Sequence, residues 1–360
     1  MNLPLPFKEK MKHLLQDEYD AFIESYNEEK KQGLRINTLK IAIDDFMNIN
    51  PFHLEEIPWA EEGYFYQASD RPGKHPFHDA GLYSIKEPSA MAVAEFVDPQ
   101  PGERVLDLCA APGGKTTHMA SKMNGEGLLI ANEIHPQRAK ILSQNVERMG
   151  IQHAIVTNET PERLAARFPS YFDRILVDAP CSGEGMFRKD EEACEQWSPE
   201  NVALCANRQD DILTHAQAML KPGGVLVYST CTFSPEENEG TISRFLEEYP
   251  NFTIEKQEMH KGFRTGRKDW VENPAPGIEN TIRIWPHHVH GEGHYIAVMK
   301  KSEGEEPRQG KSRKQERLPS DLQKQWNQFI SETLNVAPAG HYKLFKDQLY
   351  LLPERVPSLD

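Results

Sequence analysis

The sequence lacks the long hydrophobic runs and the cysteine framework that mark several classes of protein. None of its apolar runs approaches the ~20 residues needed to span a bilayer. Its first ten residues, "MNLPLPFKEK", contain no apolar segment of the kind that a signal peptide needs. The five cysteines are an odd number without regular spacing, which fits a reducing compartment. We therefore expect a soluble, cytoplasmic protein that acts as a monomer and does not associate with a membrane.

The sequence also lacks an excess of positive charge. Lys and Arg number 41 against 55 Asp and Glu, so the formal net charge is −14. Bulk charge of this sign argues against a nucleic-acid partner, but binding to nucleic acid depends on a local basic face. Three basic clusters are candidates, at residues 71–78, 261–268 and 308–317, and each of them also fits a solvated loop.

From about residue 88 onward, apolar strands alternate with helices. This alternation predicts an α/β fold with a doubly wound, Rossmann-like parallel sheet. The predicted strands lie at residues 103–111, 127–134, 153–159, 172–180 and 225–232. The predicted helices lie at residues 89–97, in the second half of 112–123, at 136–149 and at 200–224. The segments 280–288 and 294–301 predict a closing hairpin.

The segments on either side of this region predict further units. Residues 1–50 are expected to be mostly helical, with a short strand at 33–40, and residues 51–85 to form irregular surface structure. The charged segment 301–317 lacks apolar periodicity, which indicates a linker. A helix and a hairpin are expected in residues 318–360, which are few for an autonomous domain. The expected division is therefore an N-terminal extension at 1–85, a main domain at 86–300, a linker at 301–317 and an incomplete C-terminal α+β domain at 318–360.

The stretch "VLDLCAAPGGKTT" predicts a cofactor site at a strand–turn–helix junction. It is not a phosphate-binding P-loop, because Cys109 stands where the first glycine of that motif belongs. The dinucleotide pattern G-x-G-x-x-G is also absent. An acidic residue on the strand, Asp107, before a turn of small residues suits a cationic cofactor without phosphate, such as S-adenosylmethionine. Glu133 ends the next strand, where a ribose-binding acid is expected. The alternative is an ordinary α/β turn with an acid present by chance.

Two cysteines follow two core strands. Cys181 lies in "VDAPCSG", after Asp178, and Cys231 lies in "STCTFSPEENE". Both segments end strands at the edge where open α/β sheets bind ligands. Ser234 and Glu237 predict a capping box for a following helix, and the N-terminus of that helix would lower the pKa of a nearby thiol.

A thiolate beside a methyl donor suits one class of reaction. Carbon 5 of a pyrimidine is not nucleophilic, but adding a thiolate to carbon 6 makes an enamine whose carbon 5 can attack a sulfonium methyl group. Asp178, acting near ring N3, would assist the addition. The carbon 5 proton must then leave and the enzyme sulfur must be eliminated. One cysteine would attack and the other could serve the release step.

Four separated blocks of the sequence resemble the Sun/Nop-type RNA (cytosine-5)-methyltransferases, especially their bacterial RsmF-like branch. The blocks are "GLYSIKEPSAM", "DLCAAPGGKT", "DAPCSGEGMFRKD" and "YSTCTFSPEENE", in the order of the family. The resemblance covers about residues 1–300. It implies a methyltransferase that uses S-adenosylmethionine and modifies cytosine in RNA, with small-subunit rRNA as the expected target.

The resemblance also implies roles for individual residues. Cys231 is the nucleophile, Cys181 assists product release, and Asp178 lies between cofactor and base. The implied cofactor contacts are Asp107, the loop Cys109, Ala110, Ala111, Pro112, Gly113, Gly114 and Lys115, then Glu133, Asn158 and Asp178. Asn158 stands where the family often has an acid near the adenine. DNA enzymes use the cysteine of their Pro-Cys motif as nucleophile, so the second cysteine argues for RNA.

The flanking segments resemble RNA-binding parts of the same family. Residues 1–85 resemble its N-terminal RNA-binding extension, with "LRINTLK" as the signature, and the C-terminal segment resembles the start of a longer RNA-binding domain. Two alternatives stay open: a tRNA cytosine-5 methyltransferase, and an RNA-binding ribosome-assembly factor that has lost catalysis. The intact cysteines and cofactor loop count against the second.

Several other residues have weaker functional claims. We expect Cys194 and Cys205 to be packing residues. Arg188 and Lys189 could grip a phosphate or lie on the solvated surface. Four histidines have no paired cysteine near them, so we expect a hairpin rather than a metal site. They are His287, His288, His290 and His294.

Overall fold

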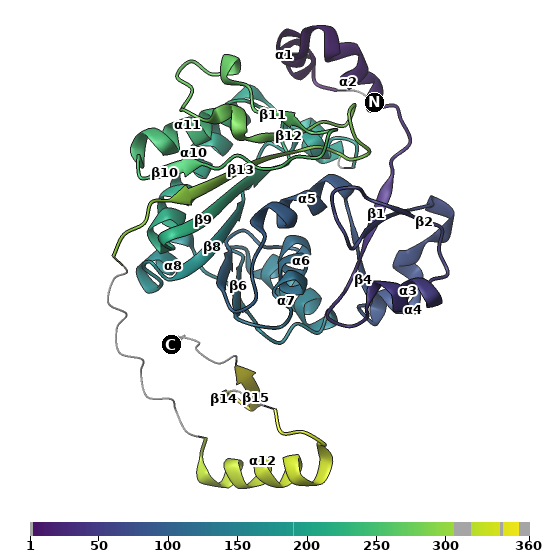
Figure 1. Cartoon of the computed structure of the whole chain (residues 1–360), viewed down its shortest axis with the longest axis vertical. Coiled ribbons are helices and arrows are strands. Elements are labelled where there is room, and N and C mark those ends of the chain that lie inside the picture. The colour runs from purple at the N-terminus through teal and green to yellow at the C-terminus, as the bar shows by residue number, and fades with distance from the viewer. Residues whose placement is uncertain (1–2, 190, 306–317, 339–340, 353–360) are drawn as a thin grey trace.

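The structure is a computed structural model that describes residues 3–189, 191–305, 318–338 and 341–352. Its N-terminal part combines short helices with a small antiparallel sheet, drawn in purple and blue in Figure 1. The helices are α1 (Leu5–Leu15), α2 (Tyr19–Ser25), α3 (Ile43–Ile49) and α4 (Pro76–Asp79). The strands are β1 (Gln32–Ile36), β2 (Leu54–Glu56), β3 (Gly63–Tyr66) and β4 (Tyr83–Lys86), in the order β2-β3-β1-β4.

The prediction of irregular surface structure at 51–85 is wrong. Three strands of the antiparallel sheet lie there, and all four residues of β3 are buried. Tyr64 and Tyr83 pack with Phe46 in a small hydrophobic core. Strands of three or four residues are too short to show an alternating pattern, and the Gly and Pro residues between them form the turns.

The central sheet confirms the predicted doubly wound fold. Its strands are β5 (Arg104–Asp107), β6 (Leu128–Asn132), β7 (Ala154–Thr157), β8 (Phe172–Asp178), β9 (Leu220–Thr230), β10 (Phe252–Ile254), β11 (Arg264–Thr265), β12 (Ile282–Ile284) and β13 (His294–Lys301). The order is β11-β12-β13-β9-β8-β5-β6-β7, and β10 pairs with β13. Strands β5 to β9 are parallel, whereas β12 and β13 form the predicted antiparallel hairpin beside β9.

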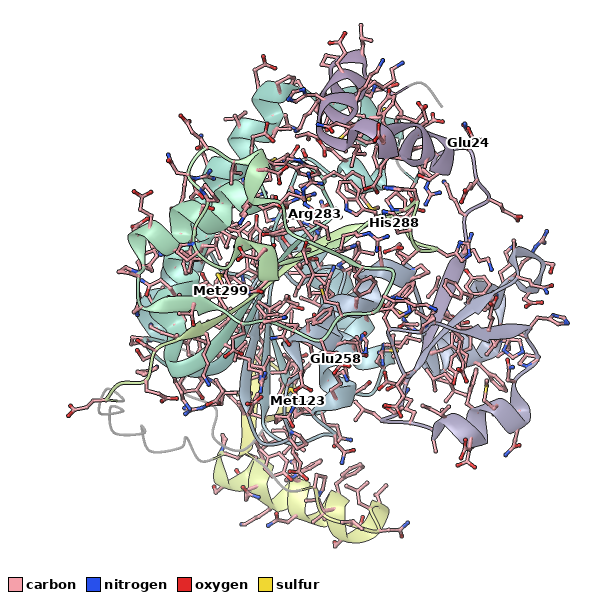
Figure 2. The ribbon with its side chains drawn as sticks, turned by 45° about the horizontal axis from the view of Figure 1, so that its top comes forward. Glu24, Met123, Glu258, Arg283, His288 and Met299 are labelled. Atoms are coloured by element: carbon pink, nitrogen blue, oxygen red, sulfur yellow. The ribbon has the colours of Figure 1, made fainter. Side chains whose placement is uncertain are left out.

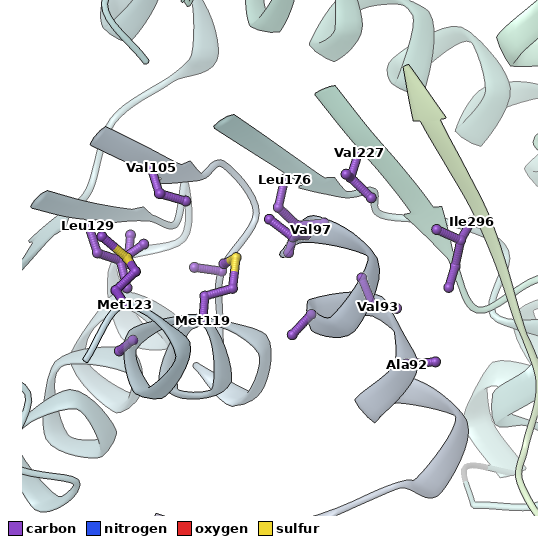
Figure 3. Close-up of a cluster of buried hydrophobic side chains, with 14 of the residues drawn as sticks. Ala92, Val93, Val97, Val105, Met119, Met123, Leu129, Leu176, Val227 and Ile296 are labelled. Carbon is purple, nitrogen blue, oxygen red and sulfur yellow. The ribbon is translucent and has the colours of Figure 1, made fainter. Parts of the chain in front are cut away.

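Helices cover both faces of this sheet. They are α5 (Pro88–Val97), α6 (Gly114–Lys122), α7 (Pro136–Arg148), α8 (Pro161–Arg167), α10 (Pro199–Met219) and α11 (Glu239–Glu248), whereas α9 (Glu191–Gln196) packs against a separate buried cluster. Successive strand residues face opposite sides: Val105 packs under α5 and α6, while Leu106 packs towards α10 and α11. Figure 3 shows the first of these cores, where Val93 and Met119 meet the strand residues. Helix α10 is shorter than predicted, because β9 begins at Leu220, ahead of the Pro and Gly of "KPGG".

The N-terminal helices pack against the antiparallel side of the central sheet. Phe7 and Phe22 enter a cluster of buried aromatic residues that also holds Trp285. Figure 2 labels Arg283, which lies in β12 of the sheet, and His288, which contacts Glu18 between α1 and α2. Short 3₁₀ segments connect the regular elements, at Gln16–Glu18, Ala68–Asp70, Pro72–Lys74, Glu184–Met186, Lys268–Trp270 and Ile278–Asn280.

The C-terminal residues form the predicted helix and hairpin, α12 (Ser320–Thr333) with β14 (His341–Phe345) and β15 (Gln348–Leu352). The side chain of Trp326 contacts Tyr342, which joins the helix to the hairpin. Most of the predicted linker, including the basic cluster at 308–317, lies outside the described residues. Among the described helices, none is both long and apolar enough to cross a membrane.

Candidate active site

The two cysteines meet at the carboxyl edge of the parallel strands. Cys181 follows β8 by three residues and Cys231 directly follows β9. These strands are neighbours and run parallel, so their ends lie side by side. The sulfur atoms are 3.4 Å apart, which is hydrogen-bonding distance for two thiols.

Hydrogen bonds between the two cysteine-bearing segments fix this approach. The hydroxyl of Ser182 lies 2.8 Å from that of Thr232. The backbone N–H of Gly185 donates to the carbonyl oxygen of Cys231 at 2.8 Å. A Cβ atom at position 185 would lie 2.8 Å from that same oxygen, so only glycine allows the segments to come this close.

Two buried glutamates reinforce the junction. Glu237 accepts hydrogen bonds from the backbone N–H of Ser182 (2.8 Å), the hydroxyl of Ser182 and the side-chain amide of Gln209 (3.0 Å). Glu184 accepts from the Ser234 hydroxyl at 2.6 Å and from the Phe233 N–H at 2.9 Å. Burial raises the pKa of Glu237 to about 7.

The predicted capping box is therefore wrong. Ser234 and Glu237 turn their side chains to other partners, and α11 begins only at Glu239, after Asn238, with no side-chain cap. Residues 235–238, which precede α11, form turns. Helix α11 thus begins well after Cys231, and the predicted effect of its N-terminus on that thiol has no structural basis. The three-residue separation of Ser234 and Glu237 imitated a cap because both residues tie the two cysteine segments together.

Asp178 and Lys115 form an ion pair beside the thiols. The Lys115 ammonium donates to Asp178 Oδ2 at 2.7 Å, and the Ser229 hydroxyl donates to Oδ1 at 2.7 Å. Burial opposes ionisation of Asp178, but the charge and hydrogen bond of Lys115, together with His294 and Ser229, outweigh burial and lower the pKa of the carboxyl. Burial likewise opposes the charge on Lys115, and Asp178 reverses this effect and raises the pKa of the amine. In this structure the pair carries its proton on Lys115.

The hydrogen bond to Cys231, together with burial, raises the pKa of Cys181 well above its ordinary value. The surroundings of Cys181 thus favour its protonated form, and either sulfur can be the donor in the contact between the two thiols. Cys231 lies within the electrostatic reach of Lys115.

The predicted cofactor loop joins β5 to α6. Gly113 adopts a left-handed conformation (φ +104°) that glycine takes without strain. Asp107 is fully buried and accepts one hydrogen bond, from the Thr116 hydroxyl at 2.6 Å. Its other oxygen, Oδ1, has no hydrogen-bond partner among the described residues. Burial raises the pKa of Asp107 to about 7. Burial also raises the pKa of the Cys109 thiol, which packs against the core.

Glu133 and Asn158 lie together at the ends of β6 and β7. Glu133 is buried, and its carboxylate accepts from the His135 N–H at 2.9 Å and pairs with Arg138 at 3.3 Å. Arg138 also donates to the Ala111 carbonyl oxygen at 2.9 Å, which links the acid to the loop. The Asn158 amide donates to the Glu133 carbonyl oxygen at 2.6 Å. The residues predicted to hold the cofactor therefore follow the ends of adjacent strands.

The structure also places His294 at the site, a residue that the motifs did not indicate. His294 begins β13, and its neighbour Tyr295 pairs with Thr230, so His294 lies beside Cys231. Its Nδ1 is 3.2 Å from the Ser89 hydroxyl. Burial, and then the charge of Lys115, lower the pKa of His294 to about 4. The predicted hairpin contained this histidine, but the sequence did not say which strand the hairpin would join.

Other candidate residues have structural partners. Arg188 pairs with Glu292 at 2.6 Å and donates to the Ser25 carbonyl oxygen at 2.6 Å, so its guanidinium already has partners within the chain. Lys189 is exposed. His287 and His288 lie 3.0 and 2.6 Å from a Glu18 oxygen.

The two remaining cysteines are packing residues. Cys205 is buried, and Cys194 packs against the aromatic cluster around Phe7. This outcome confirms the packing role predicted for both.

Comparison with known proteins places the chain in a family. Residues 94–300 match the model described as 16S rRNA methyltransferase RsmB/F, and residues 3–88 match that of the N-terminal domain of 16S rRNA methyltransferase RsmF. The first match alone spans more than half of the chain. The chain belongs to the RsmB/F methyltransferase family. This membership confirms the resemblance inferred from the four sequence blocks.

Curated RsmF proteins are similar over most of the chain. The ribosomal RNA small subunit methyltransferase F of Escherichia coli strain SMS-3-5 is 37% identical over 294 residues, which cover 79% of this chain and 60% of that protein. The protein of the same name from Escherichia fergusonii gives the same values. The chain therefore spans about 60% of the length of these relatives.

Solved structures support the fold. A methyltransferase homolog protein from Pyrococcus horikoshii matches with a TM-score of 0.72 and 29% identity, over 81% of this chain and 93% of that one. NSun6 from Pyrococcus horikoshii, solved with SFG, matches with a TM-score of 0.71 and 21% identity, over 84% of this chain and 99% of that one. Both likenesses agree with the doubly wound sheet.

Proposed function

We propose that the chain transfers a methyl group from S-adenosylmethionine to carbon 5 of cytosine in RNA, with small-subunit rRNA as the substrate. One observation carries this proposal: two thiols 3.4 Å apart lie beside the Lys115–Asp178 pair. Pyrimidine carbon 5 chemistry needs a thiolate, a group that serves ring N3 and a second group for release. Family membership supports the same reaction.

The proposed cofactor site has the chemistry that S-adenosylmethionine requires. The buried oxygen Asp107 Oδ1 has no hydrogen-bond partner among the described residues, and a cationic amine would satisfy it. Glu133 lies two strand ends away from Asp178, a place suited to ribose hydroxyls. Asn158, whose amide donates to the Glu133 carbonyl oxygen, would lie near the adenine. When bound, the cofactor supplies an electrophilic methyl group.

Each residue near the thiols has a proposed part in the reaction. Cys231 forms a bond from its sulfur to carbon 6, and the electron pair of the ring moves towards N3. The proton that N3 needs is held on Lys115 and reaches the base through Asp178. This corrects the expectation that Asp178 acts as an acid by itself, because the pKa of Asp178 is lowered.

In the release step, the bond between Cys231 and carbon 6 is broken and the proton on N3 is returned. Cys181 hands its proton to the departing sulfur of Cys231 and then accepts the proton from carbon 5. The carbon–sulfur bond breaks as the ring double bond returns, and the N3 proton goes back to Lys115. The reaction therefore frees one proton overall. Cys231 holds this proton after release and loses it when it ionises for the next cycle.

Binding of RNA is proposed for the parts that flank the methyltransferase domain at 86–300. The N-terminal extension at 1–85 packs against the same domain through Phe7 and Phe22, so its surface is fixed relative to the thiols. The residues 318–360, after the linker at 301–317, are proposed to contribute to RNA binding as well.

The test is methylation at nucleotide resolution. Bisulfite sequencing of rRNA and tRNA from a strain without this gene should show one or more 5-methylcytosines lost from small-subunit rRNA and restored by the wild-type gene. Loss of a tRNA position instead would identify a tRNA enzyme. No change at any cytosine in either RNA would contradict the proposed activity and favour an assembly factor.

A further inference from the structure

One lysine near the cofactor loop has no role in the chemistry described above. Lys86 ends β4, the strand that leads from the N-terminal sheet into the central domain. The next residue, Glu87, caps α5 by accepting from the N–H groups of Ser89 and Ala90. Lys86 is therefore held between a paired strand and a capped helix, and its backbone position is well defined.

The side chain of Lys86 lies against the cofactor turn. A Cβ atom placed on Gly114 would collide with the Lys86 amine, and it would lie 2.8 Å from Lys86 Cε. The missing side chain at position 114 thus makes room for the lysine. The amine also lies within electrostatic reach of Asp107 and Asp178, which end two strands of the central sheet.

This amine has no anionic partner of its own. Across the part of the chain that the structure describes, Lys86 forms no hydrogen bond or ion pair through its side chain, whereas its neighbour Lys115 is paired with Asp178. Burial, together with the positive charge of Lys115, lowers the pKa of Lys86 well below its ordinary value. A half-buried lysine beside a second lysine is unfavourable unless an anion binds there.

We propose that the Lys86 amine binds the α-carboxylate of the cofactor and so selects cofactors that carry an intact amino-acid end. This inference rests on the proposed use of S-adenosylmethionine. The amino-acid end of that molecule carries one positive and one negative group. Asp107 offers a free oxygen to the first, and Lys86 offers a free amine to the second.

An RNA phosphate is the competing anion. Two observations favour the cofactor carboxylate. Lys86 lies directly over Gly114, inside the turn that begins α6. It also shares its surroundings with Asp107, which is fully buried and out of reach of a polynucleotide backbone.

The test uses two natural sulfonium compounds that differ by one carboxylate. Calorimetry of the full chain would measure binding of S-adenosylmethionine and of its decarboxylated form. The wild type should prefer S-adenosylmethionine by about 10- to 100-fold, the range expected for a hydrogen bond between charged groups. In Lys86→Met and Lys86→Gln this preference should fall to about twofold or less. Lys140→Met, which removes an exposed lysine of α7, should keep it.

Other outcomes contradict the inference in distinguishable ways. Equal preference in wild type and Lys86→Met would overturn it, and weaker RNA binding in the same variant with unchanged cofactor binding would assign Lys86 to a phosphate. A wild type that binds neither compound would overturn the proposed cofactor itself. Matching unfolding midpoints in the variants and wild type exclude misfolding as the cause of an effect.

Discussion

The thiol half and the cofactor half of the site each contain one fully buried carboxyl group whose pKa burial raises to about 7. Their partners differ. Glu237, in the thiol half, receives hydrogen bonds from Ser182 and Gln209 on both of its oxygens. Asp107, in the cofactor half, receives one bond, from Thr116, and its second oxygen is unpartnered among the described residues.

This difference separates a structural acid from a binding acid. The chain itself satisfies Glu237, so the thiol half is organised before any ligand arrives. Asp107 keeps an unused acceptor in a buried place, which costs free energy unless a donor binds. We infer that the thiol half is preorganised and that the cofactor half becomes complete only when the cofactor binds.

The largest effects are expected from the two cysteines. Cys231→Ala should reduce methylation by roughly 10⁴-fold or more, because no bond to carbon 6 can form. Cys181→Ala should let that bond form and persist, giving an RNA–protein species that survives denaturing gel electrophoresis. The double variant should resemble Cys231→Ala.

Cofactor binding supplies the control for these cysteine variants. All three should bind S-adenosylhomocysteine as the wild type does, since the thiols belong to the other half of the site. If Cys231→Ala is the variant that traps RNA, the two roles are exchanged. Cys205→Ala, at a buried packing position, should trap no RNA.

Ionisation of Asp107 is expected to change the affinity for the cofactor by about tenfold as the pH changes. With a pKa of about 7, Asp107 is mostly neutral at pH 6 and mostly ionised at pH 8, and only the ionised form attracts the cofactor amine. The affinity for S-adenosylhomocysteine should therefore rise by about tenfold from pH 6 to pH 8. Calorimetry at several pH values measures this rise.

Asp107→Asn should bind more weakly and lose most of the pH dependence. Asp45→Asn, an exposed change on α3, should keep both the affinity and its rise with pH. A wild type whose affinity stays constant from pH 6 to pH 8 would show that Asp107 does not titrate in this range and would weaken its assignment as the binding acid.

Much of the fold followed from local sequence patterns. The buried strands β5, β6 and β8 and the helices between them have strong periodicity and clear Gly or Pro boundaries, so their type was predictable. The N-terminal sheet was not, because β2, β3 and β4 have only three or four residues each. Their core forms only when β1 joins them from earlier in the chain.

The site was predictable in its residues and less so in its contacts. Motif spacing located Asp107, Asp178 and both cysteines. It gave a wrong account of Glu237, since a helix cap and a tie between two loops need the same residue types. His294 and Lys86 come from segments that only the fold brings to the strand ends, so no local pattern could assign them.

The smallest expected effect is the pH dependence of stability due to Glu237. The pKa of Glu237 is about 7 in the folded chain and near its ordinary value of 4.5 in the unfolded chain, so the folded chain holds this proton more tightly. The stabilising contribution is complete below pH 4.5 and is lost as the pH rises through 7.

Glu237→Gln keeps an acceptor for Ser182 and cannot ionise. The free energy of unfolding of the wild type should therefore fall between pH 5 and pH 7.5, relative to this variant, by on the order of 2 kcal/mol. Urea titrations at each pH measure the difference, and Glu236→Gln, at the exposed neighbouring position, should follow the wild type. If wild type and Glu237→Gln lose stability in parallel, Glu237 is already ionised in the folded chain, and the likeness between the two buried carboxyls disappears.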